Sequence, residues 1–181
     1  MHMTKFSTLQ DRLLVAMPSM DDPHFSQAVI YVYEHNEHGA MGITINKPMS
    51  LTLEGLLEQL DLPIVKSAQT ENNPILLGGP VAQKHGFVIH LDVKTNITLT
   101  TSKEVLKAIG EGKGPQQAIV SLGYSGWEAG QLEQEIIDNC WILAPADPQI
   151  FFNTPFKDRW KAAASLVGVN FTFLAREIGH A

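Results

Sequence analysis

The chain changes character in the stretch Gly123-Tyr124-Ser125-Gly126-Trp127-Glu128-Ala129-Gly130-Gln131-Leu132-Glu133-Gln134-Glu135-Ile136. The apolar run at 118–122 that precedes this stretch predicts a strand, whereas its own second half is acidic and typical of a helix. A turn from strand to helix places Ser125 where some hydrolases hold a nucleophile. The role of this serine therefore separates an enzyme from a binding protein.

The serine-hydrolase pattern G-x-S-x-G is incomplete around Ser125. The pattern requires a second glycine where this chain has Trp127, and so large a side chain would clash with a helix packed closely under the turn. Ser125 and Glu128 have the spacing of a capping box, in which the serine hydroxyl accepts from the backbone N–H three residues on. We therefore expect Ser125 to cap a helix over 127–139, with Trp127 anchoring that helix to the core.

The length and charge of the chain limit its class. It has 181 residues, 44% of them hydrophobic, which predicts one domain over residues 1–181 with a sizeable core. A small subdomain in the C-terminal half is compatible with this length. The net charge is −6, and lysine and arginine are not clustered, which disfavours direct binding of nucleic acid. The acidic helix expected at 127–139 is typical of a solvated face.

Cysteine usage and apolar runs predict a cytoplasmic protein. Cys140 is the only cysteine, so no internal disulfide forms, and its apolar neighbours predict an unreactive core thiol. No apolar run approaches the roughly 20 residues that cross a bilayer. The first residues lack the apolar segment of a signal peptide.

Runs of β-branched and aromatic residues predict eight strands, at 13–17, 26–33, 41–46, 75–77, 87–91, 97–99, 118–122 and 140–144. Capping residues and helical spacing predict helices at 52–60, 101–112 and 127–139, with two more that start at Asp147-Pro148 and Thr154-Pro155. Strands outnumber helices, and several neighbouring strands have connections of hairpin length. The expected fold class is α+β, with a mixed, largely antiparallel β-sheet flanked by helices.

Two further segments bear residues of functional type. The polar stretch 34–39 predicts a hairpin tip, in which His35 and His38 are three residues apart; hydrogen bonding within the loop is the expected role, because a metal needs three or four converging ligands. Gly78-Gly79-Pro80 follows a strand, and we expect its glycines to provide positive φ at a tight turn. A nest of backbone N–H groups for an anion is the alternative.

Three segments taken together resemble the AlgH/YqgE family of bacterial proteins: residues 34–48, residues 78–81 and residues 123–135. The segment 18–25 and the terminal Gly179-His180-Ala181 agree with this resemblance, which spans nearly the whole chain. The resemblance implies an α+β fold of curved β-sheets with helices. It also implies the label of transcriptional regulator that the family carries, and it transfers no catalytic or binding residues.

We therefore expect a non-catalytic regulatory or ligand-binding protein whose three glycine-bearing turns line one surface, since binding sites gather on loops at strand ends. The candidate binding residues are His35, Asn36, His38, Gly39, Gly78, Gly79, Tyr124, Ser125 and Gly126. The expected partner is a small ligand or a protein, and the sequence identifies no cofactor, metal ligand or catalytic residue. The alternatives are a hydrolase or metal-assisted enzyme that uses Ser125 or His35 and His38, and direct control of transcription through DNA.

Overall fold

The computed structural model describes residues 6–66, 70, 72–92 and 96–172. Its strands are β1 (Arg12–Ala16), β2 (Val29–Asn36), β3 (Gly39–Thr44), β4 (Pro48–Thr52), β5 (Pro74–Leu77), β6 (Val81–Leu91), β7 (Ile97–Thr100), β8 (Ala118–Glu128) and β9 (Trp141–Pro145). Its helices are α1 (Leu53–Gln59), α3 (Lys103–Gly110), α4 (Gln131–Ile137), α5 (Pro148–Phe152), the 3-10 helix η1 (Phe156–Asp158) and α6 (Arg159–Ser165).

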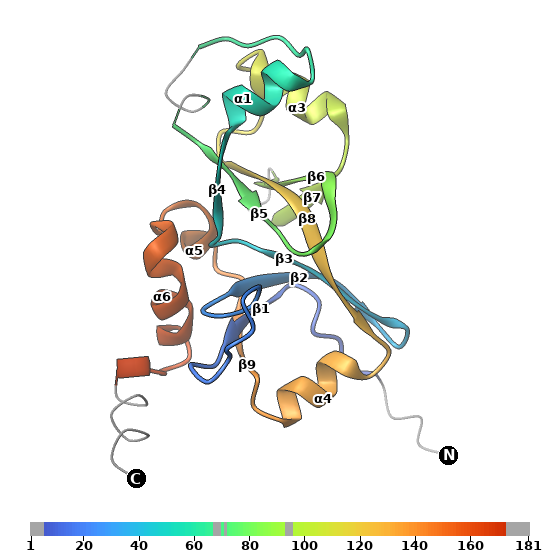
Figure 1. Ribbon diagram of the computed structural model, residues 1–181, viewed down its shortest axis with the longest axis vertical. Coiled ribbons are helices and arrows are strands. Elements are labelled where there is room, and N and C mark those ends of the chain that lie inside the picture. Colours follow the sequence, from blue (N-terminus) through green and yellow to red (C-terminus); the bar gives the residue numbers. More distant parts are fainter. Residues whose placement is uncertain (1–5, 67–69, 71, 93–95, 173–181) are drawn as a thin grey trace.

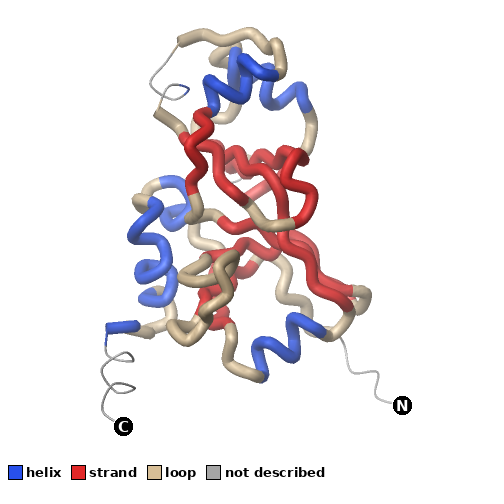
Figure 2. Tube along the Cα trace, viewed as in Figure 1, coloured by secondary structure: helices blue, strands red, loops and turns tan. Residues whose placement is uncertain are grey.

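The strands form one sheet in the order β4-β5-β8-β3-β2-β1-β9, with β6 paired to β8 and β7 paired to β6. The pairing of β5 with β8 is parallel, and the other strand pairs are antiparallel. The helices lie around this sheet (Figure 2), so the α+β prediction is confirmed. In the described part of the chain, no helix has the length and hydropathy to cross a membrane.

Strand β8 links two parts of the sheet, one that contains β4 to β7 and one that contains β1 to β3 and β9 (Figure 1). Its first half pairs with β5 and β6, and its last residues pair with β3. Ser121 faces Leu76 of β5 and also Phe87 of β6. Because a strand has two edges, β5 and β6 lie on opposite edges of β8. The segment that joins β5 to β6 must therefore cross β8.

This crossing explains Gly78 and Gly79. A Cβ atom on Gly79 would lie 2.2 Å from the carbonyl carbon of Tyr124, and one on Gly78 would lie 2.4 Å from the carbonyl oxygen of Gly123. Neither Gly78 nor Gly79 has a positive φ, whereas Gly123 has a φ of +80°. The prediction of a positive-φ turn at Gly78-Gly79 is therefore wrong, since these glycines are needed because two backbones touch.

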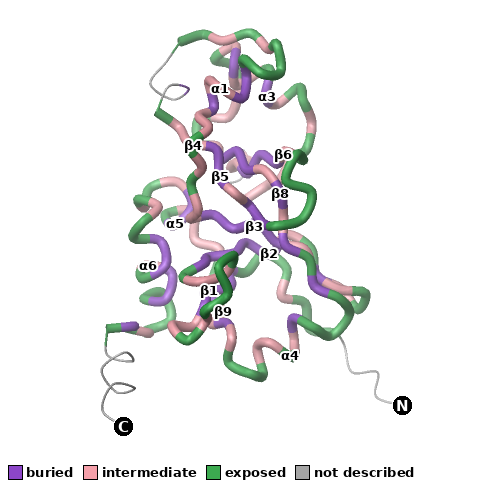
Figure 3. Tube along the Cα trace, viewed as in Figure 1, coloured by how far each residue is buried: buried purple, intermediate pink, exposed green. Residues whose placement is uncertain are grey.

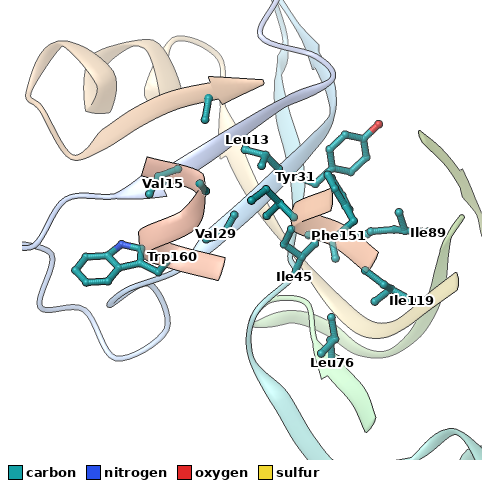
Figure 4. Packing of buried hydrophobic residues seen from close by; sticks show 14 of the residues in the cluster. Leu13, Val15, Val29, Tyr31, Ile45, Leu76, Ile89, Ile119, Phe151 and Trp160 are labelled. Carbon is teal, nitrogen blue, oxygen red and sulfur yellow. The ribbon is translucent and has the colours of Figure 1, made fainter. Parts of the chain in front are cut away.

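Buried apolar residues form three clusters between the sheet and the helices (Figure 3). The largest lies under α5 and α6, where Phe151 and Trp160 join residues of β1, β2, β5 and β8 (Figure 4). The second places Leu132 of α4 against Trp127 and Trp141. The third joins Leu57 of α1 to α3, β5 and β6. The sheet is thus covered on both faces and at one end.

Local capping signals located three of the helices. The side chains of Thr52, Ser102 and Asp147 accept hydrogen bonds from backbone N–H groups at the first turns of α1, α3 and α5. The segment after Thr154-Pro155 begins as the 3-10 helix η1 and continues as α6. The three capped helices are confirmed because each cap depends on residues close together in the chain. A helical segment does follow Thr154-Pro155, but it starts at Phe156 without a side-chain cap, so the prediction that Thr154 caps it is wrong.

The helix prediction at 127–139 is wrong at its start. Strand β8 continues to Glu128, and α4 begins only at Gln131, after Gly130 with a φ of +77°. Ser125 therefore lies inside a strand and caps no helix. The physical reason is tertiary: residues Gly39 to Gly42 of β3 pair with this part of β8 and fix it as a strand.

The hairpin prediction also needs correction. Strand β2 includes Glu34, His35 and Asn36, so the turn consists only of Glu37 and His38, and β3 starts at Gly39. Three residues assigned to a loop tip thus alternate between the two faces of the sheet. This alternation decides which of them reach the surface.

Candidate functional site

A hollow of about 190 Å³ lies on the β2–β3 hairpin, next to the end of β8. We call it the hairpin surface, and it is lined by Glu34, Asn36, His38, Gly39, Ala40, Met41 and Trp127. Glu34 and Gly126 both face Met41 across the strand pairs. The side-chain oxygen of Asn36 accepts from the backbone N–H of His38 at 2.8 Å and holds the turn in shape.

His35 points away from the hairpin surface, toward α4. Its side chain is 1% exposed. The backbone N–H of Leu9 donates to Nδ1 at 2.8 Å, so the ring proton lies on Nε2, which is 2.6 Å from a carboxylate oxygen of Glu133. His35 therefore ties the segment before β1, the hairpin and α4 together.

The two histidines do not converge. His38 lies at the turn with a side chain that is 87% exposed, whereas His35 is enclosed on the other face. Among the described residues, no group of three or more His, Cys, Asp or Glu side chains is arranged to hold a metal ion. The geometry thus does not favour the metal-assisted alternative.

Ser125 is 1% exposed, within β8. In the described structure, its hydroxyl and that of Ser121 are the buried side-chain groups without a hydrogen-bond partner. Both serines lie on the face of β8 that includes Gly123, where the Gly78-Gly79 segment crosses. A nucleophile must reach its substrate. The burial of Ser125 therefore does not favour the hydrolase alternative.

The remaining candidate residues lie in β8 or in the link between β5 and β6 that crosses it. Gly78 and Gly79 are buried at the crossing, and Gly126 is exposed beside Met41. The half-buried Tyr124 ring packs edge-on to Phe87, with 6.1 Å between the ring centroids. Of the nine candidate residues, Asn36, His38 and Gly39 line the hollow, and Gly126 adjoins it.

Tyr33 lies beside these groups in β2. Its hydroxyl donates to the sulfur of Met41 at 3.3 Å. Burial, with smaller contributions from the charge of Glu34 and from the nearby Tyr124, raises the pKa of Tyr33 to about 12. The phenol is therefore neutral at physiological pH, and it supports Met41 from within the sheet.

Sequence reasoning missed the internal role of the acidic helix. One carboxylate oxygen of Glu135 accepts from the indole N–H of Trp127 at 2.8 Å and from that of Trp141 at 2.9 Å. Together with the bond from His35 to Glu133, these bonds attach the inner side of α4 to the sheet. The available signal was a glutamate placed between two tryptophans, and a charged-face pattern does not reveal it.

Cys140 lies half-buried just before β9, at the margin of the cluster around Trp141. Burial raises the pKa of its thiol, and the carboxylates of Glu135 and Asp138 raise it further. The thiol form, which is a poor nucleophile, is therefore favoured.

Residues 13–172 match the AlgH-like family. The chain belongs to this family. An AlgH-like relative from Chromobacterium violaceum, named UPF0301 protein, is 45% identical over 183 residues, which cover 96% of this chain and 98% of that protein. The UPF0301 protein YqgE of Escherichia coli is also 45% identical, over 96% of this chain and 99% of its own. The family prediction is confirmed.

Two solved structures resemble this AlgH-like chain. The solution structure of AlgH from Pseudomonas aeruginosa has a TM-score of 0.75 and 44% identity, and each chain is covered over 100% of its length. A crystal structure of a Corynebacterium diphtheriae protein has a TM-score of 0.65 over 88% of this chain and 87% of its own. At 22% identity the second likeness concerns the fold alone.

Proposed function

We propose that this protein is a non-catalytic regulatory or ligand-binding protein that holds a small ligand or a protein partner at the hairpin surface. The observation that carries the proposal is the hollow itself, in which the apolar side chain of Met41 lies beside the polar residues Glu34, Asn36 and His38. Binding pockets typically pair apolar walls with a few polar groups that orient the ligand.

Charge on the hairpin surface favours a ligand with a cationic group. Glu34, Glu37 and Glu128 are exposed at or beside the hollow. Within the described part of the chain, these three carboxylates form one ion pair, which joins Glu37 to His38 at 3.9 Å. Both of its side chains are largely exposed to solvent. Such a pair contributes little. The uncompensated negative potential therefore attracts cations.

The burial of the reactive candidates supports a non-catalytic role. Ser125 is enclosed in β8, and both ring nitrogens of His35 are engaged by hydrogen bonds. Neither side chain is open to a substrate. The single cysteine supports a location in the reducing cytoplasm.

The experiment is a thermal-shift screen of metal ions, nucleotides and metabolites, repeated on two glycine variants. Gly126 faces Met41, and a Cβ there would meet only Tyr124, at 3.8 Å, so Gly126→Gln covers the hollow without disturbing β8. Gly86→Gln is the matched control, because a Cβ on this strand glycine meets only Leu122, at 3.9 Å.

A ligand at 100 times its dissociation constant stabilises the folded state by about 2.7 kcal/mol, which is readily visible as a shift in Tm. We expect the shift to disappear in Gly126→Gln and to persist in Gly86→Gln. A ligand that stabilises both variants alike binds elsewhere and contradicts the proposal. A ligand that NMR shows to be chemically converted by the protein contradicts the non-catalytic role.

A further inference from the structure

A second and larger recess lies between the α1–α3 end of the molecule and the helices α5, η1 and α6. Its volume is about 310 Å³. Asn73 and Gln117 contribute polar side chains from one side, and Phe152, Phe156 and Arg159 line the other. We call it the Arg159 cleft. It shares no lining residue with the hairpin surface, so the inference below goes beyond the proposed function.

Arg159 is a buried cation, with 4% of the residue exposed. Its Nε donates to the carbonyl oxygen of Thr154 at 2.9 Å, and its Nη1 donates to the carbonyl oxygen of Ile45. The guanidinium carbon lies 4.4 Å from the centroid of the Phe156 ring. These contacts fix the plane of the guanidinium group at the wall of the cleft.

No carboxylate of the described residues lies within 4.0 Å of Arg159. The other terminal nitrogen, Nη2, has no hydrogen-bond acceptor within the same part of the chain. Burial lowers the pKa of Arg159 to about 10, which still leaves the group charged at neutral pH. A buried charge is costly unless an anion compensates it. The described residues provide no such anion beside Arg159.

The rest of the lining selects the type of anion. Arg159 is the one charged residue among the described residues that line the cleft. The partly exposed Phe152 and Phe156 provide an aromatic wall, and the side-chain amides of Asn73 and Gln117 provide neutral donors and acceptors. The volume suits a small molecule. A guanidinium group binds carboxylate or phosphate through paired N–H···O bonds.

We propose that the Arg159 cleft binds a small organic anion whose carboxylate or phosphate group pairs with Arg159 while its apolar body lies against Phe152 and Phe156. The anion supplies the negative charge that the fold leaves out. The cleft is bordered by α1 and α3 on one side and by α5 and η1 on the other. The bound anion therefore lies between these two pairs of helices.

The test is isothermal titration calorimetry with benzoate, phenyl phosphate and the uncharged benzamide. We expect the affinity of the better of the two anions to exceed that of benzamide by about tenfold or more, which is the gain expected from one charge-assisted hydrogen bond. The amide NMR signals of Ile119 and Phe151, which also line the cleft, should move during the titration. The stronger of the two anions identifies the head group.

Three variants separate the cleft from general charge effects. Arg159→Gln should remove the preference for anions over benzamide. Since Arg159 also holds two carbonyl groups, Gln117→Glu tests the cleft with the arginine intact: the added carboxylate should weaken binding of the anion about tenfold and leave benzamide unchanged. Lys157→Gln is the matched control, because this exposed lysine of η1 does not line the cleft, and anion binding should persist.

Three results would overturn the proposal. They are equal affinity for benzoate, phenyl phosphate and benzamide, undiminished anion binding in Gln117→Glu, and a loss of binding as large in Lys157→Gln as in Gln117→Glu. None of them bears on the hairpin surface, whose test uses Gly126→Gln.

Discussion

The α4 side of the sheet and the Arg159 cleft both enclose strongly polar side chains. The histidine and the two indoles on the α4 side have hydrogen-bond partners of complementary charge or polarity, whereas Arg159 in the cleft has no carboxylate partner among the described residues. On the α4 side, His35 is bonded at both ring nitrogens, and the indole N–H groups of Trp127 and Trp141 share one carboxylate of Glu135. In the cleft, Arg159 has two carbonyl groups and an aromatic face, and no carboxylate of the described chain lies within 4.0 Å.

This difference separates polar groups that hold the fold from polar groups that are open to a ligand. A fully satisfied network adds rigidity, and each lost partner exposes an unpaired buried group. An unmatched buried cation adds little to stability by itself. Stability measurements should therefore respond strongly on the α4 side and weakly in the cleft.

The largest effect is expected from Trp127→Ala, which removes a nearly buried ring from the cluster under α4. We expect a loss of about 3–5 kcal/mol in the free energy of unfolding, measured with urea. Trp127→Phe is the control, since it keeps an aromatic ring but loses the N–H donor to Glu135, and it should cost less. Equal losses in the two variants would show that packing contributes little on this side.

Glu135→Ala should cost about 2–3 kcal/mol, because two buried indole donors lose a charged acceptor. Glu128→Ala, which removes an exposed carboxylate at the end of β8, should change the stability by less than about 0.5 kcal/mol. Urea unfolding of both variants under the same conditions measures the contrast. If the two glutamates proved equivalent, the bond from Glu135 to the tryptophans would have no energetic role.

Arg159→Met should cost about 1 kcal/mol or less without added anion, since relief of the unmatched charge offsets the two lost hydrogen bonds to carbonyl oxygens. The stabilisation of the wild-type protein by benzoate should vanish in this variant. Thermal unfolding with and without benzoate provides both values. A loss as large as that in Glu135→Ala would show that Arg159 belongs with the structural groups.

Tyr33→Phe should have the smallest effect at neutral pH, because its hydroxyl bonds only to a sulfur. The pKa of Tyr33 is raised from 10.0 to about 12, so its contribution is complete below pH 10 and is lost as the pH rises through about 12. The variant should therefore lose less stability than the wild type between pH 9 and pH 11, measured by urea unfolding. Parallel curves would contradict this role for the phenol.

Sequence patterns predicted the elements whose causes are local. The caps at Thr52, Ser102 and Asp147 lie next to the helices they start. The end of β8 could not be predicted in this way, because β3, which is distant in sequence, determines its conformation. The capping-box spacing of Ser125 and Glu128 is present, but strand pairing overrides it.

The candidate sites divide in the same manner. Turn chemistry drew attention to Asn36, His38 and Gly39, which line the hollow, but Met41 and Trp127 reach it only through strand register. Arg159 did leave a signal in the sequence. It lies three residues after Phe156 and four before Ala163, on the apolar side of its helical segment, where a charge is unusual. The prediction of one domain over residues 1–181 stays a prediction.

The crossing of Gly78-Gly79 over β8 also constrains the order in which the chain can be assembled during synthesis. The link between β5 and β6 leaves the ribosome before β8, yet it packs directly on the backbone of Gly123 and Tyr124. Strands β5 and β6 are not paired with each other, since β8 separates them. The α1–α3 end of the sheet therefore cannot close until β8 has emerged, so this part of the molecule completes its folding late in translation.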